Sequence, residues 1–251
     1  MRLTAAVITK NEERQIERCL RSLAFCDELL VLDSGSTDRT RELAAACGAR
    51  VLLDPDWRGF ATQRNRALAA ARGEWVLMVD ADEWVPTELA DAIRAALAAP
   101  GAHAAFRMPR LSSYCGQDMR HGGWWPDHVT RLMRRAGSRY EGEIHERCIV
   151  PGAVGTLTPA LRHESFRDLD QVLAKVNAYS SAGARELVAA GRPASLERAL
   201  LKGAWAFVRT YLLRAGFLDG RRGLMLAISN AEGTYYRVAK AWLAAQQDKP
   251  R

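Results

Sequence analysis

The stretch Val76-Leu77-Met78-Val79-Asp80-Ala81-Asp82-Glu83 joins an apolar run directly to a cluster of carboxylates. A short apolar run bounded by polar residues predicts a strand that is buried on both faces, as in a parallel sheet. Ligands of open α/β sheets bind outside the carboxyl ends of such strands. Asp80 and Asp82 would supply hard oxygen ligands there, which favours a site for Mg²⁺ or Mn²⁺ shared with substrate phosphates. An Asp-x-Asp triplet alone is more often a turn or surface polarity, and the buried strand before it favours the site.

Around this stretch, apolar runs alternate with segments of helical periodicity. We predict strands over residues 3–8, 29–32, 50–53 and 75–79, and helices over 11–23, 37–47, 60–71 and 86–98. Alternation at this spacing implies right-handed crossovers and a mostly parallel sheet flanked by helices. The expected fold class is therefore α/β and Rossmann-like.

The pattern changes after Pro100. Short strands are expected over residues 104–113, 128–134, 144–150 and 157–162, and helices from Arg167 onward with breaks at 191–193 and 216–223. We therefore predict an α/β ligand-binding and catalytic domain over residues 1–165 and a helical C-terminal subdomain over 166–251.

Composition and charge limit the possible functions. The chain has 251 residues, of which 48% are hydrophobic and 26% charged, as in globular proteins. The sequence has no long uncharged apolar run and its apolar start is too short for a secretory signal, so we expect a cytoplasmic protein. Its five cysteines have irregular spacing, which indicates reduced thiols rather than a disulfide framework or a zinc site.

The net charge of +7 belongs to one end of the chain. Residues 1–159 contain 21 basic and 21 acidic residues, whereas residues 160–251 contain 15 basic and 8 acidic ones. Over residues 200–214 the cations alternate with large apolar residues, which favours a helix in the headgroup layer of an anionic membrane over a nucleic-acid arm. The alternative is an amphipathic helix packed on its own domain. We expect no nucleic-acid partner, and peripheral contact with the inner face of the cytoplasmic membrane.

Two common nucleotide-binding motifs are absent. The sequence contains neither Gly-x-Gly-x-x-Gly nor Gly-x-x-x-x-Gly-Lys-Ser/Thr. Their absence disfavours a dinucleotide cofactor and a P-loop nucleotide hydrolase.

Four motifs in the first 85 residues together resemble those of family 2 glycosyltransferases. They are Val7-Ile8-Thr9-Lys10-Asn11-Glu12, Asp33-Ser34-Gly35-Ser36-Thr37-Asp38, Gly59-x-x-x-Gln63-Arg64-Asn65-x-Ala67 and Val79-Asp80-Ala81-Asp82-Glu83. The resemblance implies the GT-A fold and a nucleotide-sugar donor. Later motifs resemble the branch of bacterial lipopolysaccharide core β-glucosyltransferases: Trp124-Trp125-Pro126-Asp127, Arg131-Leu132, Ile144-His145-Glu146, Gly216-Phe217-Leu218-Asp219-Gly220 and Gly223-Leu224.

The resemblance assigns donor-binding roles to residues after the first strands. It implies that Thr9, Glu12 and Asp33 lie near the base and ribose, and that Arg64 faces the diphosphate together with Asp80. The alternative for Asp33 is a turn or a helix cap. The alternative for Arg64 is a solvated position on a helix.

The same resemblance assigns metal-binding roles. It implies that Asp80 and Asp82 hold the divalent cation on the donor diphosphate. His163 occupies the position where some GT-A enzymes add a histidine ligand, although an isolated histidine is usually structural.

Inverting transfer requires a carboxylate that takes the proton of the acceptor hydroxyl. The candidates are Glu146 and Asp127, and we favour Glu146. The alternative is that Glu146 only orients a loop or pairs with an arginine. Trp124 and Trp125 are expected either to stack on a sugar ring or to fill a core.

The leading hypothesis is a metal-dependent inverting glycosyltransferase. It would move a hexose, most plausibly glucose from UDP-glucose, to a lipid-linked saccharide such as the lipopolysaccharide inner core. The first alternative keeps the donor and changes the acceptor to a polyprenyl-linked or capsular glycan. The second is a non-catalytic membrane-associated scaffold of the same fold.

Overall fold

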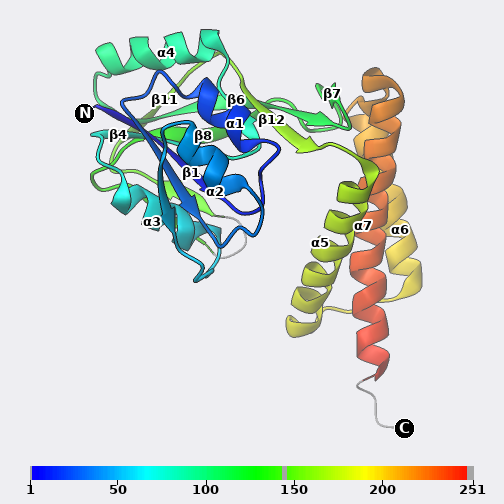
Figure 1. Ribbon diagram of the computed structural model, residues 1–251. Coiled ribbons are helices and arrows are strands. Elements are labelled where there is room, and N and C mark those ends of the chain that lie inside the picture. The colour runs from blue at the N-terminus through cyan, green and yellow to red at the C-terminus, as the bar shows by residue number, and fades with distance from the viewer. Residues whose placement is uncertain (1, 143–145, 248–251) are drawn as a thin grey trace. The chain divides into compact units, whose positions relative to one another are not determined.

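The computed structural model of the protein describes residues 2–142 and 146–247 (Figure 1). Its contacts define two compact units, and each is built from two segments of the chain. The first unit comprises residues 1–110 and 127–163, and the second comprises 111–126 and 164–251. The predicted division into an α/β domain over residues 1–165 and a helical subdomain over 166–251 stays a prediction.

A mixed sheet forms the centre of the first unit. The strands follow the order β3-β2-β1-β4-β8-β6-β12-β5. Their bounds are β1 Leu3–Thr9, β2 Glu28–Asp33, β3 Arg50–Leu53, β4 Trp75–Asp80, β5 Glu83–Trp84, β6 His103–Tyr114, β8 Asp127–Arg134 and β12 Leu161–Phe166. Strands β3, β2, β1 and β4 are parallel neighbours, whereas β8 runs antiparallel to both β4 and β6. The predicted α/β class is confirmed.

Helices cover both faces of the parallel strands (Figure 1). They are α1 Ile16–Ser22, α2 Thr40–Ala46, α3 Phe60–Ala70 and α4 Thr87–Ala98. Alternate residues of a strand point to opposite faces. Ala5 and Val7 accordingly pack in one cluster with residues of α1, α2 and α4, while Ala6 and Ile8 pack in another with residues of α3. Burial on both faces leaves polar side chains only at the strand ends, which is where a ligand can be bound.

Several local boundaries differ from the sequence prediction, and two of the differences have a direct physical reason. The helix expected over residues 11–23 begins only at Ile16, because Asn11 has a left-handed φ of 57° that a helix cannot continue. The strand expected over 157–162 is wrong: β11 covers Ala153–Thr156 and β12 starts at Leu161. Pro159 lies between them and lacks the N–H group that a sheet ladder needs.

A smaller sheet follows β8. Strand β9, Arg139–Glu141, pairs antiparallel with β10, Arg147–Ile149. The strand predicted over 144–150 overlaps β10, but Ile144 and His145 lie outside the described residues.

Three long helices dominate the second unit. They are α5 Leu169–Ala189, α6 Leu196–Val208 and α7 Gly220–Gln247, with a π-helical turn over Arg209–Leu213 and a 3₁₀ turn over Gly216–Asp219 between the last two. Helices α5 and α6 both pack along α7. The end of β6 pairs with β7, Gln117–Asp118. Within the described ranges, no helix is long and apolar enough to cross a bilayer.

Candidate functional site

The polar ends of three neighbouring strands meet at one edge of the sheet. In the register of β1 with its neighbours, Thr9 stands beside Asp33 of β2, and Ile8 stands beside Asp80 of β4. The structure therefore brings together three strand ends that the sequence placed far apart. Asp33 and Asp80 flank the end of β1.

Asp33 is fully buried and organises its own loop. Its Oδ1 accepts hydrogen bonds from the backbone N–H groups of Gly35 (3.0 Å) and Ser36 (2.8 Å), and Oδ2 accepts from the Ser36 hydroxyl. Beside this turn, the buried hydroxyls of Thr9 and Ser34 have no hydrogen-bond partner among the described residues. Buried polar atoms are normally satisfied, so this pair points to a group that is supplied from outside the chain.

Two buried arginines hold the carboxylate of Asp80. Arg64 donates to Oδ1 at 2.7 Å and Arg131 donates to Oδ2 at 2.5 Å. Burial alone would raise the pKa of Asp80, but the guanidinium groups of Arg131 and Arg64 outweigh it and keep this pKa well below its ordinary value. Asp80 is therefore a carboxylate that stays ionised at neutral pH.

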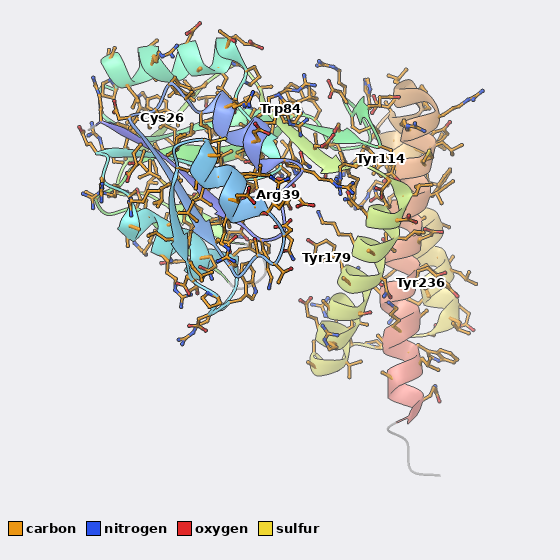
Figure 2. All side chains as sticks on the ribbon, viewed as in Figure 1. Cys26, Arg39, Trp84, Tyr114, Tyr179 and Tyr236 are labelled. Carbon is orange, nitrogen blue, oxygen red and sulfur yellow. The ribbon has the colours of Figure 1, made fainter. Side chains whose placement is uncertain are left out.

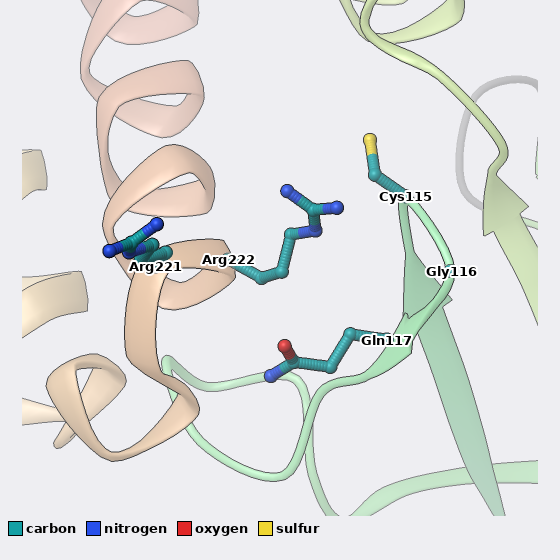
Figure 3. A pocket seen from close by; sticks show the side chains of 5 residues that line it. All are labelled: Cys115, Gly116, Gln117, Arg221 and Arg222. Carbon is teal, nitrogen blue, oxygen red and sulfur yellow. The ribbon is translucent and has the colours of Figure 1, made fainter.

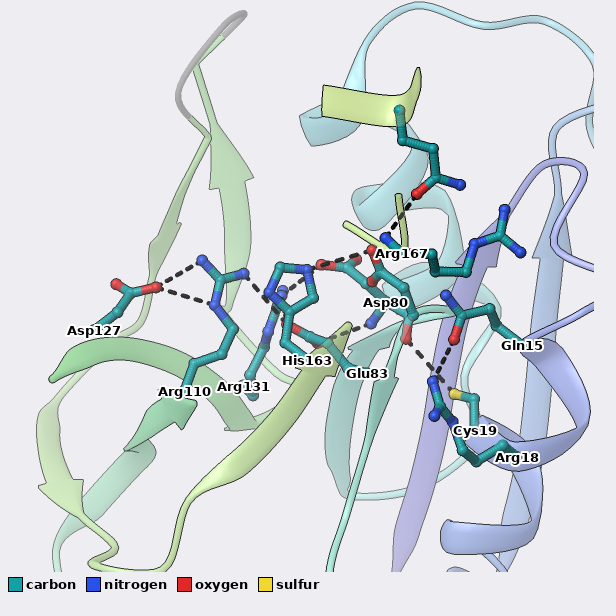
Figure 4. A network of polar contacts seen from close by, with 12 residues as sticks. Gln15, Arg18, Cys19, Asp80, Glu83, Arg110, Asp127, Arg131, His163 and Arg167 are labelled. Atoms are coloured by element: carbon teal, nitrogen blue, oxygen red, sulfur yellow. Dashed lines mark hydrogen bonds and ion pairs between the residues drawn. The ribbon is translucent and has the colours of Figure 1, made fainter. Parts of the chain in front are cut away.

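From Asp80 the ion pairs continue in alternating sign toward Asp127 (Figure 4). Arg131 also donates to the buried Glu83 at 2.6 Å, and Arg110 contacts the same Glu83 oxygen at 3.4 Å. Arg110 then donates twice to Oδ2 of Asp127, at 3.0 and 2.6 Å. Glu83 completes the turn by accepting the backbone N–H of Asp80. One chain of charges thus links Asp80, a predicted metal ligand, to Asp127, one of the two predicted bases.

On its other side the network reaches Glu146. Oε1 of Glu146 lies 3.4 Å from Nε of Arg64, whose side chain is only 3% exposed. The guanidinium carbon of Arg64 also lies 5.5 Å from the ring centroid of Tyr140. Arg64 is a buried link between Asp80 and Glu146 rather than a solvated helical residue. The alternative in which Glu146 pairs with an arginine is what the structure shows, and its role as a base stays a prediction.

Asp82 pairs with His163 instead of joining the arginines. Nε2 of His163 lies 3.3 Å from Oδ2 of Asp82. Pairing of β12 with β5 positions the histidine, because His163 stands opposite Glu83 in that register.

This pair fits a divalent cation by its chemistry. A carboxylate oxygen and an imidazole nitrogen are suitable ligands, and Mg²⁺ usually keeps several waters and binds substrate phosphates as well. No group of three or more His, Cys, Asp or Glu side chains in the described part of the chain is arranged to hold a metal ion. Both oxygens of Asp80 face guanidinium groups, so its role as a metal ligand stays a prediction.

The remaining predicted residues lie apart from this network. The backbone N–H of Glu12 donates to the Thr40 hydroxyl, which fixes the loop after β1 against α2. Trp124 belongs to the second unit, where it packs partly buried beside Tyr114 and Phe166. Trp125 lies under the guanidinium of Arg120, at 5.8 Å from the ring centroid.

Sequence reasoning missed the pairing roles of three residues. Glu83, Arg110 and Arg131 connect the predicted carboxylates, yet none was assigned a function. The signal for Arg131 was a charged residue directly before Leu132-Met133 in a predicted strand, and all three residues are buried. A buried cation requires an anionic partner, although the sequence does not say which one.

The sequence profile of glycosyl transferase family 2 matches residues 4–161. The chain belongs to glycosyl transferase family 2. This glycosyltransferase is 30% identical to the lipopolysaccharide core biosynthesis glycosyltransferase LpsC of Rhizobium meliloti. The alignment covers 94% of this chain and 93% of that one. This glycosyltransferase is also 30% identical to an uncharacterized glycosyltransferase of Rickettsia bellii, over 95% of this chain and 85% of that one.

Solved structures confirm the fold of this glycosyltransferase. Residues 1–349 of S. aureus TarS, crystallised with UDP, align with a TM-score of 0.51 at 15% identity, covering 100% of this chain and 93% of that one. Another crystal structure of the same TarS segment aligns with a TM-score of 0.50 at 16% identity, with the same coverage. The predicted GT-A fold is confirmed.

Proposed function

We propose that this glycosyltransferase moves a hexose from a UDP-sugar, with UDP-glucose as the first candidate, to a lipid-linked saccharide with inversion at the anomeric carbon. One observation carries the proposal: the ends of β1, β2 and β4 gather a cation-paired carboxylate, a carboxylate–imidazole pair and two unsatisfied hydroxyls at one edge. That set of groups suits a ligand with a base, a diphosphate and a metal.

The base and ribose would bind at the ends of β1 and β2. The hydroxyls of Thr9 and Ser34 are buried and unsatisfied there, and each can donate to or accept from a nucleobase or ribose. Asp33 would keep the hydrogen bonds that fix its loop and would also accept a hydrogen bond from the ligand. Glu12 would approach the same ligand from the loop that Thr40 anchors.

The diphosphate would lie against the end of β4. Asp82 and His163 would hold the divalent cation together with Asp80, and the cation would stabilise the negative charge of the departing nucleoside diphosphate. Arg131 and Arg64 keep Asp80 ionised. The buried Nη1 of Arg64 has no hydrogen-bond partner in the part of the chain that the structure describes, which leaves this nitrogen for a phosphate oxygen. The chain's own contribution is therefore to hold these charges in place before the donor binds.

The proposed base is Glu146, with Asp127 as the second candidate. Glu146 is 22% exposed and contacts Arg64. Arg64 also contacts Asp80, so this arginine links the two carboxylates. Asp127 is 41% exposed and uses Oδ2 for both bonds from Arg110, which leaves Oδ1 for an acceptor hydroxyl. A carboxylate in either position would take the acceptor proton as the new glycosidic bond forms.

The membrane-facing part of the proposal rests on helix α6. Its small residues Ala199, Gly203 and Ala206 are buried, and a Cβ on Gly203 would lie 3.2 Å from Tyr235 of α7. The large side chains of Leu200, Leu201 and Trp205 are instead 63%, 72% and 56% exposed. A helix exposed to water normally buries its large apolar side chains, so this arrangement is the reverse of the usual one.

Cations accompany the exposed apolar residues of α6 and of the turns that follow. Arg198, Lys202, Arg209 and Arg214 lie in the same stretch as the exposed Leu212 and Leu213. Apolar residues beside cations favour an anionic lipid surface. An acceptor carried by a lipid would be presented at such a surface, and the likeness to a lipopolysaccharide core glycosyltransferase supports that acceptor class.

The direct test is a donor and acceptor screen that detects free UDP. Purified protein is incubated with UDP-glucose, UDP-galactose or UDP-N-acetylglucosamine, Mn²⁺, and either truncated lipopolysaccharide or a polyprenyl-linked glycan. We expect UDP release only with a lipopolysaccharide acceptor, and none from Asp82→Ala. UDP release with the polyprenyl-linked glycan alone would show that this glycan, and not lipopolysaccharide, is the acceptor. No UDP release with any donor and acceptor pair would favour a non-catalytic scaffold.

A further inference from the structure

A cavity of about 430 Å³ lies wholly within the second unit, between helices α5 and α7. Tyr179 lines the cavity, and three further aromatic side chains form part of its wall: Tyr114, Trp124 and Phe166. Their ring centroids are 5.8 to 6.2 Å apart, and Figure 2 labels Tyr114 beside the helices. A concave site of this size with an aromatic wall is typical of a small-ligand site.

The rest of the lining is mixed: Val172, Val176 and Leu226 are aliphatic, and several other residues are polar. Ser180, Ser229, Asn230 and Thr234 contribute hydroxyl and amide groups. The hydroxyl of Tyr114 lies 2.9 Å from that of Ser229, so the aromatic wall itself carries a hydrogen-bonding pair. Aromatic faces next to hydroxyl and amide groups suit a sugar, whose apolar face can contact a ring while its hydroxyls form hydrogen bonds.

Three cations line the same cavity: Lys175, Arg209 and Arg237. Among the described residues, no carboxylate lines it, and none of the three cations forms an ion pair there. Lys175 lies 4.8 Å from the ring centroid of Phe166, which joins the positive charge to the aromatic wall. Three cations without a local anion favour a negatively charged ligand.

A second hollow in this unit lacks that combination. It measures about 650 Å³ and is lined by Cys115, Gly116, Gln117, Arg221 and Arg222. Figure 3 shows Arg222 reaching toward Cys115 and Gln117, while Arg221 points away. It has cations but no aromatic face, so it does not select for a sugar.

We propose that the cavity between α5 and α7 binds an acidic saccharide, a sugar that carries a phosphate or a carboxylate. Trp124 and Phe166 would contact the sugar face, the hydroxyls would bind the sugar hydroxyls, and Lys175, Arg209 and Arg237 would pair with the anion. The cavity's preference for an acidic saccharide does not depend on the proposed function. The identification of that saccharide as the anionic sugar of the acceptor does rest on the proposed function.

The experiment uses a variant that fills the cavity without breaking the helix. Gly233 lines the cavity, and a Cβ added there would meet only Val176, at 4.0 Å. Gly233→Leu therefore occupies the space while it raises helix propensity. A second variant, Lys175→Gln with Arg237→Gln, removes charge alone. Arg192→Gln is the matched control, because Arg192 is an exposed cation of the same unit that does not line the cavity.

Binding is measured by calorimetry for maltose 1-phosphate, a glucuronate-containing disaccharide, maltose and inorganic phosphate. Saturating UDP and Mn²⁺ are present so that a phosphate group does not compete for the donor site. We expect at least one acidic disaccharide to bind tenfold or more tightly than maltose and than phosphate. Gly233→Leu and the double variant should each weaken that binding tenfold or more, and Arg192→Gln should not. Equal binding by wild type and Gly233→Leu would overturn the proposal, as would equal binding of maltose and its phosphate.

Vesicles that contain phosphatidylglycerol distinguish a glycan from a lipid headgroup. Their binding should persist in Gly233→Leu, and its loss would overturn the assignment to a saccharide. UDP binding to the wild type is measured separately, and its absence would contradict the proposed function. The comparison of saccharide binding between wild type and Gly233→Leu would still test whether the cavity binds the saccharide.

Discussion

At the scale of single residues, the two carboxylates of the Asp80-Ala81-Asp82 motif have different partners. Asp80 faces Arg64 and Arg131, whereas Asp82 faces His163. The sequence predicted both carboxylates because a buried strand ended in them. It did not predict that Arg131, on a strand 51 residues later, would bind Asp80, because antiparallel register between distant segments is set by tertiary packing.

Replacing Asp80 by Asn should lower stability in a pH-dependent way. The change leaves Arg64 and Arg131 buried beside a neutral amide, so we expect the free energy of unfolding to fall by about 3 kcal/mol at pH 7. The pKa of Asp80 is lowered in the fold, so its stabilisation is fully present above the ordinary value of about 4 and disappears as the pH falls further.

Urea denaturation at pH 7 and at pH 3 measures this difference. The gap between wild type and Asp80→Asn should be smaller at pH 3, and an equal gap at both values would contradict the assignment. Asp91→Asn is the control, because Asp91 forms an exposed pair with Arg94 (64% and 57% exposed, respectively) that should contribute less than about 1 kcal/mol.

The two candidate bases are distinguished by how much kcat falls when each is replaced by its amide. Glu146→Gln should lower kcat by about 10²- to 10⁴-fold, the range typical of general base catalysis, and Asp127→Asn should lower it less. Initial rates of UDP release give kcat, and calorimetry with UDP shows whether the donor still binds. A larger loss in Asp127→Asn, with UDP binding intact in both variants, would transfer the role to Asp127.

At the scale of elements, periodicity identified most of the strands and helices but not all of their ends. Short continuous apolar runs indicated β1 and β4, and both occur where predicted. The start of α1 was missed because a left-handed Asn11 cannot be seen from hydrophobicity. In α6 the small residues face inward and the large apolar ones face outward, an orientation that only the packing against α7 reveals.

Two glycines of helix α7 provide a matched pair. A Cβ on Gly223 would overlap the carbonyl oxygen of Gly216, while one on Gly233 has room beside Val176. Gly223→Ala should therefore destabilise the protein by about 1–3 kcal/mol through overpacking. Gly233→Ala should stabilise it by up to about 1 kcal/mol through helix propensity.

Thermal unfolding followed by circular dichroism measures both glycine variants. The melting temperature should fall for Gly223→Ala and rise or stay level for Gly233→Ala. If both variants melted at the same temperature, the close approach of Gly216 and Gly223 would be refuted.

At the scale of the whole molecule, charge and exposed apolar surface concentrate in the same part of the chain. Residues 160–251 account for the net +7, and α6 in that range exposes Leu200, Leu201 and Trp205. The sequence predicted the basic amphipathic character of this region. It could not separate a membrane-facing helix from one packed on its own domain, because both patterns look alike before the inward face is known.

Binding to anionic vesicles should depend on both charge and apolar exposure. Wild type should cosediment with phosphatidylglycerol vesicles and not with phosphatidylcholine vesicles, and 0.5 M salt should weaken binding because it screens surface attraction. Leu201→Asp should reduce binding at least tenfold, whereas Leu53→Asp, an exposed leucine of the first unit at 55% exposure, should not. Salt-insensitive binding, or equal loss in both variants, would count against a lipid-facing α6.

The central claim is that the edge formed by β1, β2 and β4 holds a divalent cation and a nucleoside diphosphate together. Calorimetric titration of UDP with and without Mn²⁺, on wild type and on Asp82→Ala, tests it most directly. The account predicts that Mn²⁺ strengthens UDP binding at least tenfold in the wild type and leaves it unchanged in Asp82→Ala. The same gain in both proteins, or no gain in either, would contradict it.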